Sequence, residues 1–443
     1  MGEAGEPKDE LPRVLTLRDA TMLVVSSVIG VGIFLTPGDV AKQFPNVGSF
    51  FFAWLLGGAL ALAGALANAE LGAMFPKAGG NYVYLRAAYH PMAGFLVGWL
   101  SFFAIFAGTV ATLAVGFTIS LSNLVPLTPG VRVVVAVLVV WVASAVNAYA
   151  TRAGAALNTS TAYLKLGAMV LLVVLGPILG HARLATEPFA SGGSASFASF
   201  GAGLAPVLFS YLGWNASVFV AGEIESPGKN LPRSLFWGLG ICTTIYVLVT
   251  ATYVLALGMH RLPGMPVVGI QAGGVLFGER GGPILAVIMM ASIFGTVNAN
   301  VLVGPRIAYA MASDGLFFRS AASLNAQRTP HLAVIGQAVV ATALIVAFRA
   351  DSDSLRNVLN YTTFAIVLAT IADTTALYVL RRRDPARPRP YRAAGYPLVP
   401  ALYLAANLAI AISMFASEPV GCLLSVAVLL AGAPIYALFA RRA

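Results

Sequence analysis

The sequence Ser26-Ser27-Val28-Ile29-Gly30-Val31-Gly32-Ile33-Phe34 interrupts the first long apolar segment of the chain. Gly30 and Gly32 weaken a helix here, because glycine gains little from helical order and loses the most backbone entropy. In lipid, an opened turn is tolerated only where its freed N–H and C=O groups face protein or a watery cavity. N–H groups at the start of a half-helix attract anions such as carboxylates. The stretch therefore predicts a ligand-binding break or, as the simpler alternative, the close approach of a neighbouring helix.

The composition is that of a polytopic membrane protein. Of the 443 residues, 58% are hydrophobic and only 10% are charged, and the mean hydropathy is +0.84. Soluble domains carry about 25% charged residues. The long, continuous apolar stretches predict spanning helices and not the short alternating strands of an outer-membrane barrel. Cys242 and Cys422 lie in apolar segments and the four histidines lack ligand spacing, so we expect no disulfide framework, metal or cofactor.

Twelve apolar segments are predicted to be transmembrane helices, so the fold class is an all-α polytopic membrane protein. They form one transmembrane domain over residues 18–440, after a cytoplasmic tail of residues 1–17 that lacks the apolar core of a cleavable signal peptide. The predicted segments cover residues 18–41, 48–75, 83–121, 131–150, 159–180, 198–222, 232–259, 281–313, 332–349, 355–380, 396–416 and 419–440.

The placement of Lys and Arg predicts the orientation of these helices. With the N-terminus in the cytoplasm, 19 of the 27 basic residues fall on the cytoplasmic side, 7 fall outside and Lys165 lies within a helix. The basic run at residues 381–392 is the strongest cytoplasmic signal, and we expect it to touch anionic lipid. Both termini are therefore expected on the cytoplasmic side of a cell membrane. The net charge of +10 is explained by this placement and not by nucleic acid.

A second interruption falls in the sixth segment, at Phe209-Ser210-Tyr211-Leu212-Gly213-Trp214-Asn215. Pro206, Gly213 and the polar Ser210 and Asn215 all disfavour an unbroken helix. Segments one and six cross in opposite directions, as expected for an inverted repeat of five helices plus five, here residues 18–180 and 198–380, with residues 396–440 outside it. The paired interruptions favour the ligand-binding interpretation of the first glycine pair.

Several motifs resemble those of the amino acid–polyamine–organocation superfamily, specifically its L-type amino acid transporter branch, over nearly the whole chain. Together, in this order and spacing, they are specific. They are Ile29-Gly30-Val31-Gly32-Ile33-Phe34, Ala69-Glu70-Leu71-Gly72, Pro76-Lys77-Ala78-Gly79-Gly80-Asn81-Tyr82, Gly213-Trp214-Asn215, Glu223, Pro227-Gly228-Lys229-Asn230-Leu231-Pro232, Phe294-Gly295-Thr296-Val297-Asn298, Arg306, Asp314-Gly315-Leu316 and Gly432-Ala433-Pro434-Ile435-Tyr436.

The resemblance implies a LeuT-like five-plus-five fold, with helices one and six broken, and alternating access to a central amino acid site. In the family, N–H groups of the opened turn hold the substrate carboxylate, and carbonyl groups of both breaks meet its ammonium. Phe209 matches an aromatic that closes over the substrate, and Val31 stands where Ser or Ala is commoner, which counts against a large substrate side chain. The substrate-binding residues implied are Ser27, Val28, Ile29, Gly30, Val31, Gly32, Phe209, Ser210, Leu212, Gly213 and Asn215.

Ionisable residues within the helices are costly in lipid and therefore candidates for a function. Lys165 either extends its ammonium to the cytoplasmic interface or, as the resemblance implies, occupies the position of a sodium ion and bridges helix five to the open turn of helix one. Glu70 and Glu223 are expected to pair with Lys or Arg. Asp373 either lines the inner vestibule or is solvated, and solvation is the preferred interpretation. Asn298 is expected to be structural or to take part in gating.

The leading functional prediction is sodium-independent transport of amino acids, most simply exchange of small or medium neutral ones. Proton-coupled symport, with Lys165 as the titrating group, stays open, as do a polyamine or amino-sugar substrate and a non-transporting sensor or channel. No catalytic pair or metal cluster indicates an enzyme. The loop at residues 122–131 lacks the cysteine that links animal L-type members to a heavy chain, so no disulfide-linked partner is expected.

Overall fold

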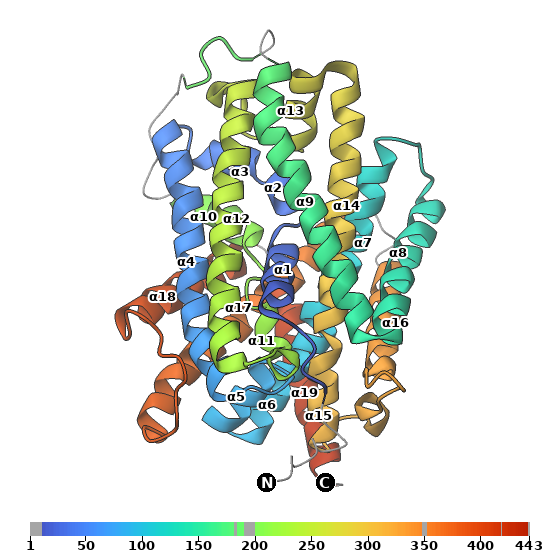
Figure 1. The fold of residues 1–443 in the computed structure, drawn as a ribbon, viewed down its shortest axis with the longest axis vertical. Helices are drawn as coiled ribbons and strands as arrows, with labels where there is room; N and C mark the ends of the chain where they lie inside the picture. Colours follow the sequence, from blue (N-terminus) through green and yellow to red (C-terminus); the bar gives the residue numbers. More distant parts are fainter. Residues whose placement is uncertain (1–10, 181–183, 190–199, 348–351, 418, 442–443) are drawn as a thin grey trace.

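The computed structural model describes residues 11–180, 184–189, 200–347, 352–417 and 419–441 as a bundle of helices (Figure 1). No strand occurs among these residues, apart from one isolated bridge between Leu15 and Ile224. The first half of the bundle consists of α1 (Leu17–Val28), α2 (Gly32–Leu35), α3 (Pro37–Gln43), α4 (Val47–Met74), α5 (Asn81–Ala88), α6 (Pro91–Leu100), the π-helical turn η1 (Ser101–Phe106), α7 (Ala107–Ser122), α8 (Pro129–Tyr149) and α9 (Thr151–Leu179).

The second half begins with another interrupted helix. It consists of α10 (Phe200–Ser210), α11 (Ala216–Phe219), α12 (Pro227–Leu257), α13 (Val268–Phe277), α14 (Gly281–Val303), α15 (Pro305–Ser313), α16 (His331–Ala347), α17 (Ser352–Arg383), α18 (Leu398–Ser417) and α19 (Pro419–Ala440). The predicted start of the sixth segment at residue 198 and the predicted end of the ninth at residue 349 lie outside the described residues, as does most of the N-terminal tail.

Ten stretches of the described chain are long and apolar enough to cross a membrane. The apolar α16 is shorter, and the segment made by α10 and α11 is interrupted, so neither belongs to the ten. Residues 11–16 and the end of α19 lie at the same end of the bundle, which we call the termini end (Figure 1). The short helix α13 lies at the opposite end (Figure 1).

Several predicted helix boundaries differ from the structure, and two of the differences are instructive. The third predicted segment, residues 83–121, is divided near Pro91, where α5 has ended and α6 begins. His90 caps α6, and its Nδ1 atom accepts a hydrogen bond of 3.2 Å from the Met92 N–H group. Proline cannot continue a preceding helix but suits the first helical position, so the signal was present in the sequence. The fifth predicted segment, residues 159–180, starts eight residues earlier, at Thr151.

The first helix is fixed at its start by a reciprocal cap. The Thr16 hydroxyl accepts a hydrogen bond from the Asp19 N–H group at 3.3 Å, and the Asp19 carboxylate accepts one from the Thr16 N–H group at 3.1 Å. The same carboxylate accepts a bond of 3.0 Å from Thr159 on α9. Such a cap satisfies N–H groups that would otherwise lack partners, and here it also holds α1 against α9.

The two interrupted helices are packed antiparallel. Helix α1 contacts α11, and α2 and α3 contact α10, so each half of one broken helix lies beside the opposite half of the other. In Figure 1, α2, α3 and α10 lie towards the end that carries α13, and α11 lies towards the termini end. The break in one helix is therefore at the same level as the break in the other.

Buried ion pairs hold the termini end together. The Arg306 guanidinium donates to the Glu223 carboxylate at 2.7 and 3.1 Å and to the Thr151 hydroxyl at 2.8 Å, and both charged side chains are fully buried. Beside Glu223, Leu15 exchanges backbone hydrogen bonds of 2.9 Å with Glu223 and Glu225. This ties the segment before α1 to the segment after α11.

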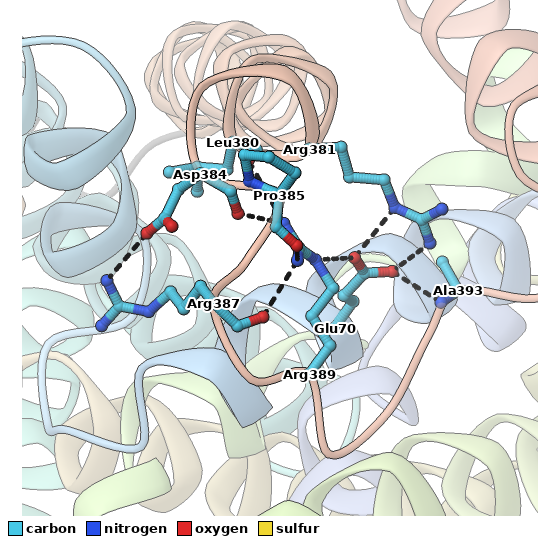
Figure 2. A network of polar contacts seen from close by, with 8 residues as sticks. All are labelled: Glu70, Leu380, Arg381, Asp384, Pro385, Arg387, Arg389 and Ala393. Atoms are coloured by element: carbon cyan, nitrogen blue, oxygen red, sulfur yellow. Dashed lines mark hydrogen bonds and ion pairs between the residues drawn. The ribbon is translucent and has the colours of Figure 1, made fainter.

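Glu70 on α4 organises the loop between α17 and α18 (Figure 2). Its buried carboxylate accepts bonds of 2.9 and 2.6 Å from Arg381 and 2.7 Å from the Ala393 N–H group, and it lies 3.2 Å from the Arg389 Nε atom. Arg389 also donates to three backbone carbonyls of this loop and to the Leu380 carbonyl near the end of α17. The expected pairing of Glu70 and Glu223 with basic side chains is therefore confirmed.

Candidate functional site

The first break leaves the helical pattern at Ile29 to Val31. Helix α1 ends at Val28 and α2 begins at Gly32, and the Gly30 N–H group donates to the Val28 carbonyl at 2.8 Å, closing a tight turn. The Phe34 and Leu35 N–H groups donate to the Val31 carbonyl at 3.1 and 3.3 Å, whereas the N–H groups of Val31 and Gly32 lie ahead of these first helical bonds. They are the donors that this break offers to a ligand.

The second break packs directly on the first. Gly213 has φ +92°, a conformation that favours glycine, and a Cβ atom there would lie 2.8 Å from the Ser27 carbonyl oxygen. A Cβ atom on Gly32 would lie 2.8 Å from the Cα atom of Ser210. A Cβ atom on Gly30, in contrast, would have no neighbour closer than 3.5 Å. Gly32 and Gly213 are therefore required for the two breaks to touch, and Gly30 is not.

Lys165 connects α9 to the first break. Its ammonium donates to the carbonyls of Ser26 at 2.8 Å and Ile29 at 2.9 Å, and it lies 2.9 Å from the Thr296 hydroxyl. The side chain is 1% exposed and lies fourteen residues from the start of α9, so its ammonium does not reach an interface. The structure thus shows the contact with helix one that the resemblance implied, and the interfacial alternative is wrong.

Helix α14 supports the same carbonyls with hydroxyl groups. Thr296 donates to the Ser26 and Ile29 carbonyls at 2.9 and 3.2 Å, and Ser292 donates to the Ile29 carbonyl at 3.1 Å. Carbonyl groups released by the break are therefore satisfied by side chains from α9 and α14. This is the arrangement that a membrane helix needs if it is to remain open within lipid.

Tyr246 on α12 joins the two breaks, and the sequence analysis did not identify it. Its buried hydroxyl lies 2.8 Å from both the Val28 carbonyl and the Ser210 carbonyl, one in each broken helix. A tyrosine in an apolar segment has no motif around it that would signal this role. Near it, the Ser210 hydroxyl lies 2.8 Å from the Thr36 hydroxyl, which links α10 to the end of α2.

A cavity of about 120 Å³ lies where the breaks meet. Of the predicted substrate-binding residues, all except Ile29 line it, and Ile29 is buried with its carbonyl directed to Lys165. The remaining lining comes from the first residue of α5, from η1 and α7, and from α11, α14 and α17. It consists of Asn81, Ile105, Phe106, Thr109, Thr112, Leu113, Phe219, Thr296, Asn300, Thr362, Thr363, Ile366, Ala369 and Thr370. No lining residue is charged.

Phe209, Leu212 and Thr363 line both this cavity and a second one. The second cavity has a volume of about 410 Å³ and is also lined by Thr36, Asp39 and Tyr403. Phe209 lines both cavities and is placed where an aromatic ring can lie between them.

The polar residues Asn215 and Asn298 differ in their surroundings. Asn215 lines the central cavity. Asn298 is fully buried; its side chain accepts a bond of 2.7 Å from Asn147 and donates one of 3.1 Å to the Gly154 carbonyl, so it joins α14 to α8 and α9. The preferred interpretation of Asp373 is wrong, because its side chain is only 1% exposed and is not solvated.

A further ion pair lies at the termini end, between α5 and α15. Arg86 pairs with Asp314, and the Tyr82 hydroxyl donates to the same carboxylate at 2.6 Å. Its hydrogen bond with Asp314 raises the pKa of the Arg86 guanidinium, and burial raises the pKa of the Tyr82 hydroxyl. Both groups keep their protons at neutral pH, so the pair holds α5 against α15.

Residues 15–438 of this chain match the family model for amino acid permeases, and this range includes both breaks, Lys165 and the whole cavity lining. The chain belongs to this family. It is 32% identical over 435 residues to the serine/threonine exchanger SteT of Bacillus subtilis, with 96% of each chain covered. It is 30% identical to the human large neutral amino acids transporter small subunit 2, covering 96% of this chain and 80% of that protein.

A third relative is the Asc-type amino acid transporter 1 of Mus musculus, which is 28% identical, covering 96% of this chain and 81% of that protein. These permeases are transporters and not enzymes. This chain is accordingly a multi-pass membrane transporter of amino acids, and the resemblance to amino acid transporters in the sequence is confirmed.

Proposed function

We propose that this permease exchanges small or medium neutral L-amino acids across the cell membrane without sodium, and that the cavity at the two breaks is its substrate site. One observation carries the proposal: the cavity brings backbone groups of both breaks together, and its described lining contains no charged residue. Backbone groups suit the carboxylate and ammonium that all amino acids share. An uncharged lining gives no partner to an acidic or basic substrate side chain, which would be costly to bury unpaired.

The roles of individual residues follow from this geometry. The substrate carboxylate binds the N–H groups of Val31 and Gly32, with that of Gly30 available once its turn to Val28 opens. The ammonium binds carbonyls around Ser27 and in residues 209–212. Threonine and asparagine side chains of α7, α14 and α17 suit small polar side chains, and the small volume, together with the bulk of Val31, favours small substrates.

Lys165 takes the place of a coupling sodium ion in this proposal. Its ammonium supplies a fixed positive charge to the carbonyls of Ser26 and Ile29, a charge that sodium-coupled relatives would obtain from the ion. A transporter with this charge built in does not require sodium to form its substrate site.

The architecture proposed is twelve transmembrane helices in an inverted repeat of five plus five. The antiparallel packing of the two broken helices supports it. Ten of the twelve helices are the long apolar stretches, and the other two are α16 and the interrupted α10–α11 segment. The excess of basic residues supports a cytoplasmic location of the termini end. The chain is proposed to work without a disulfide-linked heavy chain.

The test is uptake of labelled amino acids into liposomes that contain the purified permease. L-serine, L-alanine, L-leucine, L-lysine and L-glutamate are compared, with and without unlabelled internal amino acid, in sodium and in choline buffers. The proposal expects uptake of the neutral amino acids that requires internal amino acid and is equal in both buffers. Uptake of L-lysine or L-glutamate alone, or a requirement for sodium, would contradict it.

A further inference from the structure

Three carboxylates are buried in the described part of this chain, and one of them is not paired with a basic side chain there. Glu70 is paired with Arg381 and Arg389, and Glu223 with Arg306. Asp373, in the middle of α17, is 1% exposed and forms no ion pair with any described residue. Its Oδ1 atom is buried without a hydrogen-bond partner. An ionised carboxylate in such a place is strongly disfavoured, whereas a neutral acid is tolerated.

Asp373 has one hydrogen-bond partner among the described residues, and this partner indicates which protonation state is present. The Tyr84 hydroxyl lies 2.6 Å from the Asn68 Oδ1 atom and 3.4 Å from the Asp373 Oδ2 atom. A tyrosine has a single proton to donate, and the short distance assigns it to Asn68. The Asn68 amide is oriented by its own Nδ2 atom, which donates to the Gly64 carbonyl at 3.4 Å. The Tyr84 oxygen then has no proton left for the Asp373 Oδ2 atom 3.4 Å away, which favours a protonated Asp373.

Among the described residues, none that faces Asp373 would compensate a negative charge, and Arg86, the cation of α5, is paired with Asp314. The titratable side chains that face it are phenols, from Tyr84 and Tyr89 on α5 and Tyr403 on α18. Glu70, the charged residue of α4, is paired with Arg381 and Arg389. The sequences of η1, α7 and α19, which also contact α17, contain no charged residue. Every element around Asp373 therefore favours the neutral acid.

Asp373 lies between the substrate cavity and the termini end. Thr370, one turn earlier on α17, lines the cavity, and Arg381, two turns later, pairs with Glu70. Tyr84 belongs to α5, which also carries Tyr82 and Arg86, the partners of Asp314 on α15. A movement of α5 away from both α15 and α17 would open this ion pair and separate Tyr84 from Asp373. Water that enters there would stabilise the ionised carboxylate.

We propose that Asp373 is a proton-binding site that controls transport: it is a neutral acid in this conformation and releases its proton to cytoplasmic water when α5 moves outward. The proton passes from the Asp373 hydroxyl to water and is recovered from water before the contact with Tyr84 can form again. At high cytoplasmic pH the carboxylate stays ionised and cannot return to its buried place. This inference rests on the proposed transport function and on the cytoplasmic location of the termini end.

The first test measures protonation directly and does not depend on transport. Infrared spectra of the purified permease at neutral pH are compared with those of Asp373→Asn, an uncharged variant of nearly the same shape. The proposal expects a carboxylic-acid C=O band in the wild type that is absent from the variant. A spectrum without this band difference shows an ionised Asp373 and overturns the proposal, even if the permease transports amino acids as proposed.

The second test varies the internal pH of liposomes during exchange of labelled L-serine. Wild-type exchange is expected to fall as internal pH rises, approaching about tenfold per pH unit above the midpoint, because the protonated fraction falls by that factor. Asp373→Asn is expected to exchange at a rate that does not change with pH. Asp384→Asn, a half-exposed aspartate at the end of the same helix, is the matched control and should keep the wild-type profile.

Equal pH profiles for the wild type and Asp373→Asn would overturn the proposal. If Asp373→Asn does not fold, Tyr84→Phe replaces it: loss of the hydroxyl that accepts from the acid is expected to move the wild-type midpoint to lower pH. An unmoved midpoint in a folded Tyr84→Phe would contradict the assignment. Absence of exchange in the wild type, with the infrared band present, would instead contradict the proposed function and leave the proton site supported.

Discussion

Replacing Lys165 by methionine tests whether its charge holds the first break in its binding conformation. Methionine nearly keeps the length and apolar stem of lysine but cannot donate to the carbonyls of Ser26 and Ile29. Both carbonyls keep hydroxyl donors from α14, so neither is left without a partner. The loss should then correspond to about one charged hydrogen bond, which contributes about 1.5–3 kcal/mol.

This loss corresponds to a decrease of roughly 10- to 150-fold in substrate affinity. The assay is equilibrium binding of labelled L-serine to the purified permease, together with the KM for exchange in liposomes. The thermal stability of Lys165→Met should change little, because removal of the buried charge also removes its desolvation cost. Lys229→Met, at an exposed position on α12, is the control and should bind like the wild type. Wild-type affinity in a folded Lys165→Met protein would refute the reasoning.

Three further predictions concern the breaks and the termini end. Gly32→Ala should abolish exchange, because its Cβ atom would lie 2.8 Å from the Cα atom of Ser210. Gly30→Ala should still fold, because a Cβ atom there would have no neighbour closer than 3.5 Å. The two variants are compared by liposome uptake and by size-exclusion chromatography. Tyr246→Phe should lower exchange about tenfold, since one hydrogen bond of about 1 kcal/mol or more is lost between the two breaks, and wild-type rates would count against the bridge. Arg306→Met should leave the Glu223 carboxylate buried without its partner and destabilise the protein by about 3–5 kcal/mol, seen as a lower melting temperature in detergent; an unchanged melting temperature would be inconsistent with the buried pair.

The breaks were predictable because their signals are local. Glycine and proline act on the backbone where they occur, so Gly30, Gly32 and Gly213 marked the two interruptions without knowledge of any neighbour. The division at Pro91 had the same kind of signal, with the polar His90 directly before it, and was missed.

The surroundings of single side chains were not predictable in this way. The burial of Lys165 was obscured by the polar residues at the start of α9, which made the helix seem to begin near residue 159. Asp373 was expected to be solvated because it lies two turns from Arg381, but the packing of α4 and α5 over α17 excludes water from it. Tyr246 has no local motif; its role depends on two carbonyls that are distant in sequence.

The central claim, that the two breaks form the amino acid site, is tested most directly by an electron-microscopy map of the permease with bound L-serine. The account predicts density in the cavity between the breaks, with the carboxylate against the N–H groups of Val31 and Gly32 and the ammonium towards the carbonyls of residues 209–212. Density in the second cavity, beside Tyr403, or a carboxylate directed away from α2, would contradict it.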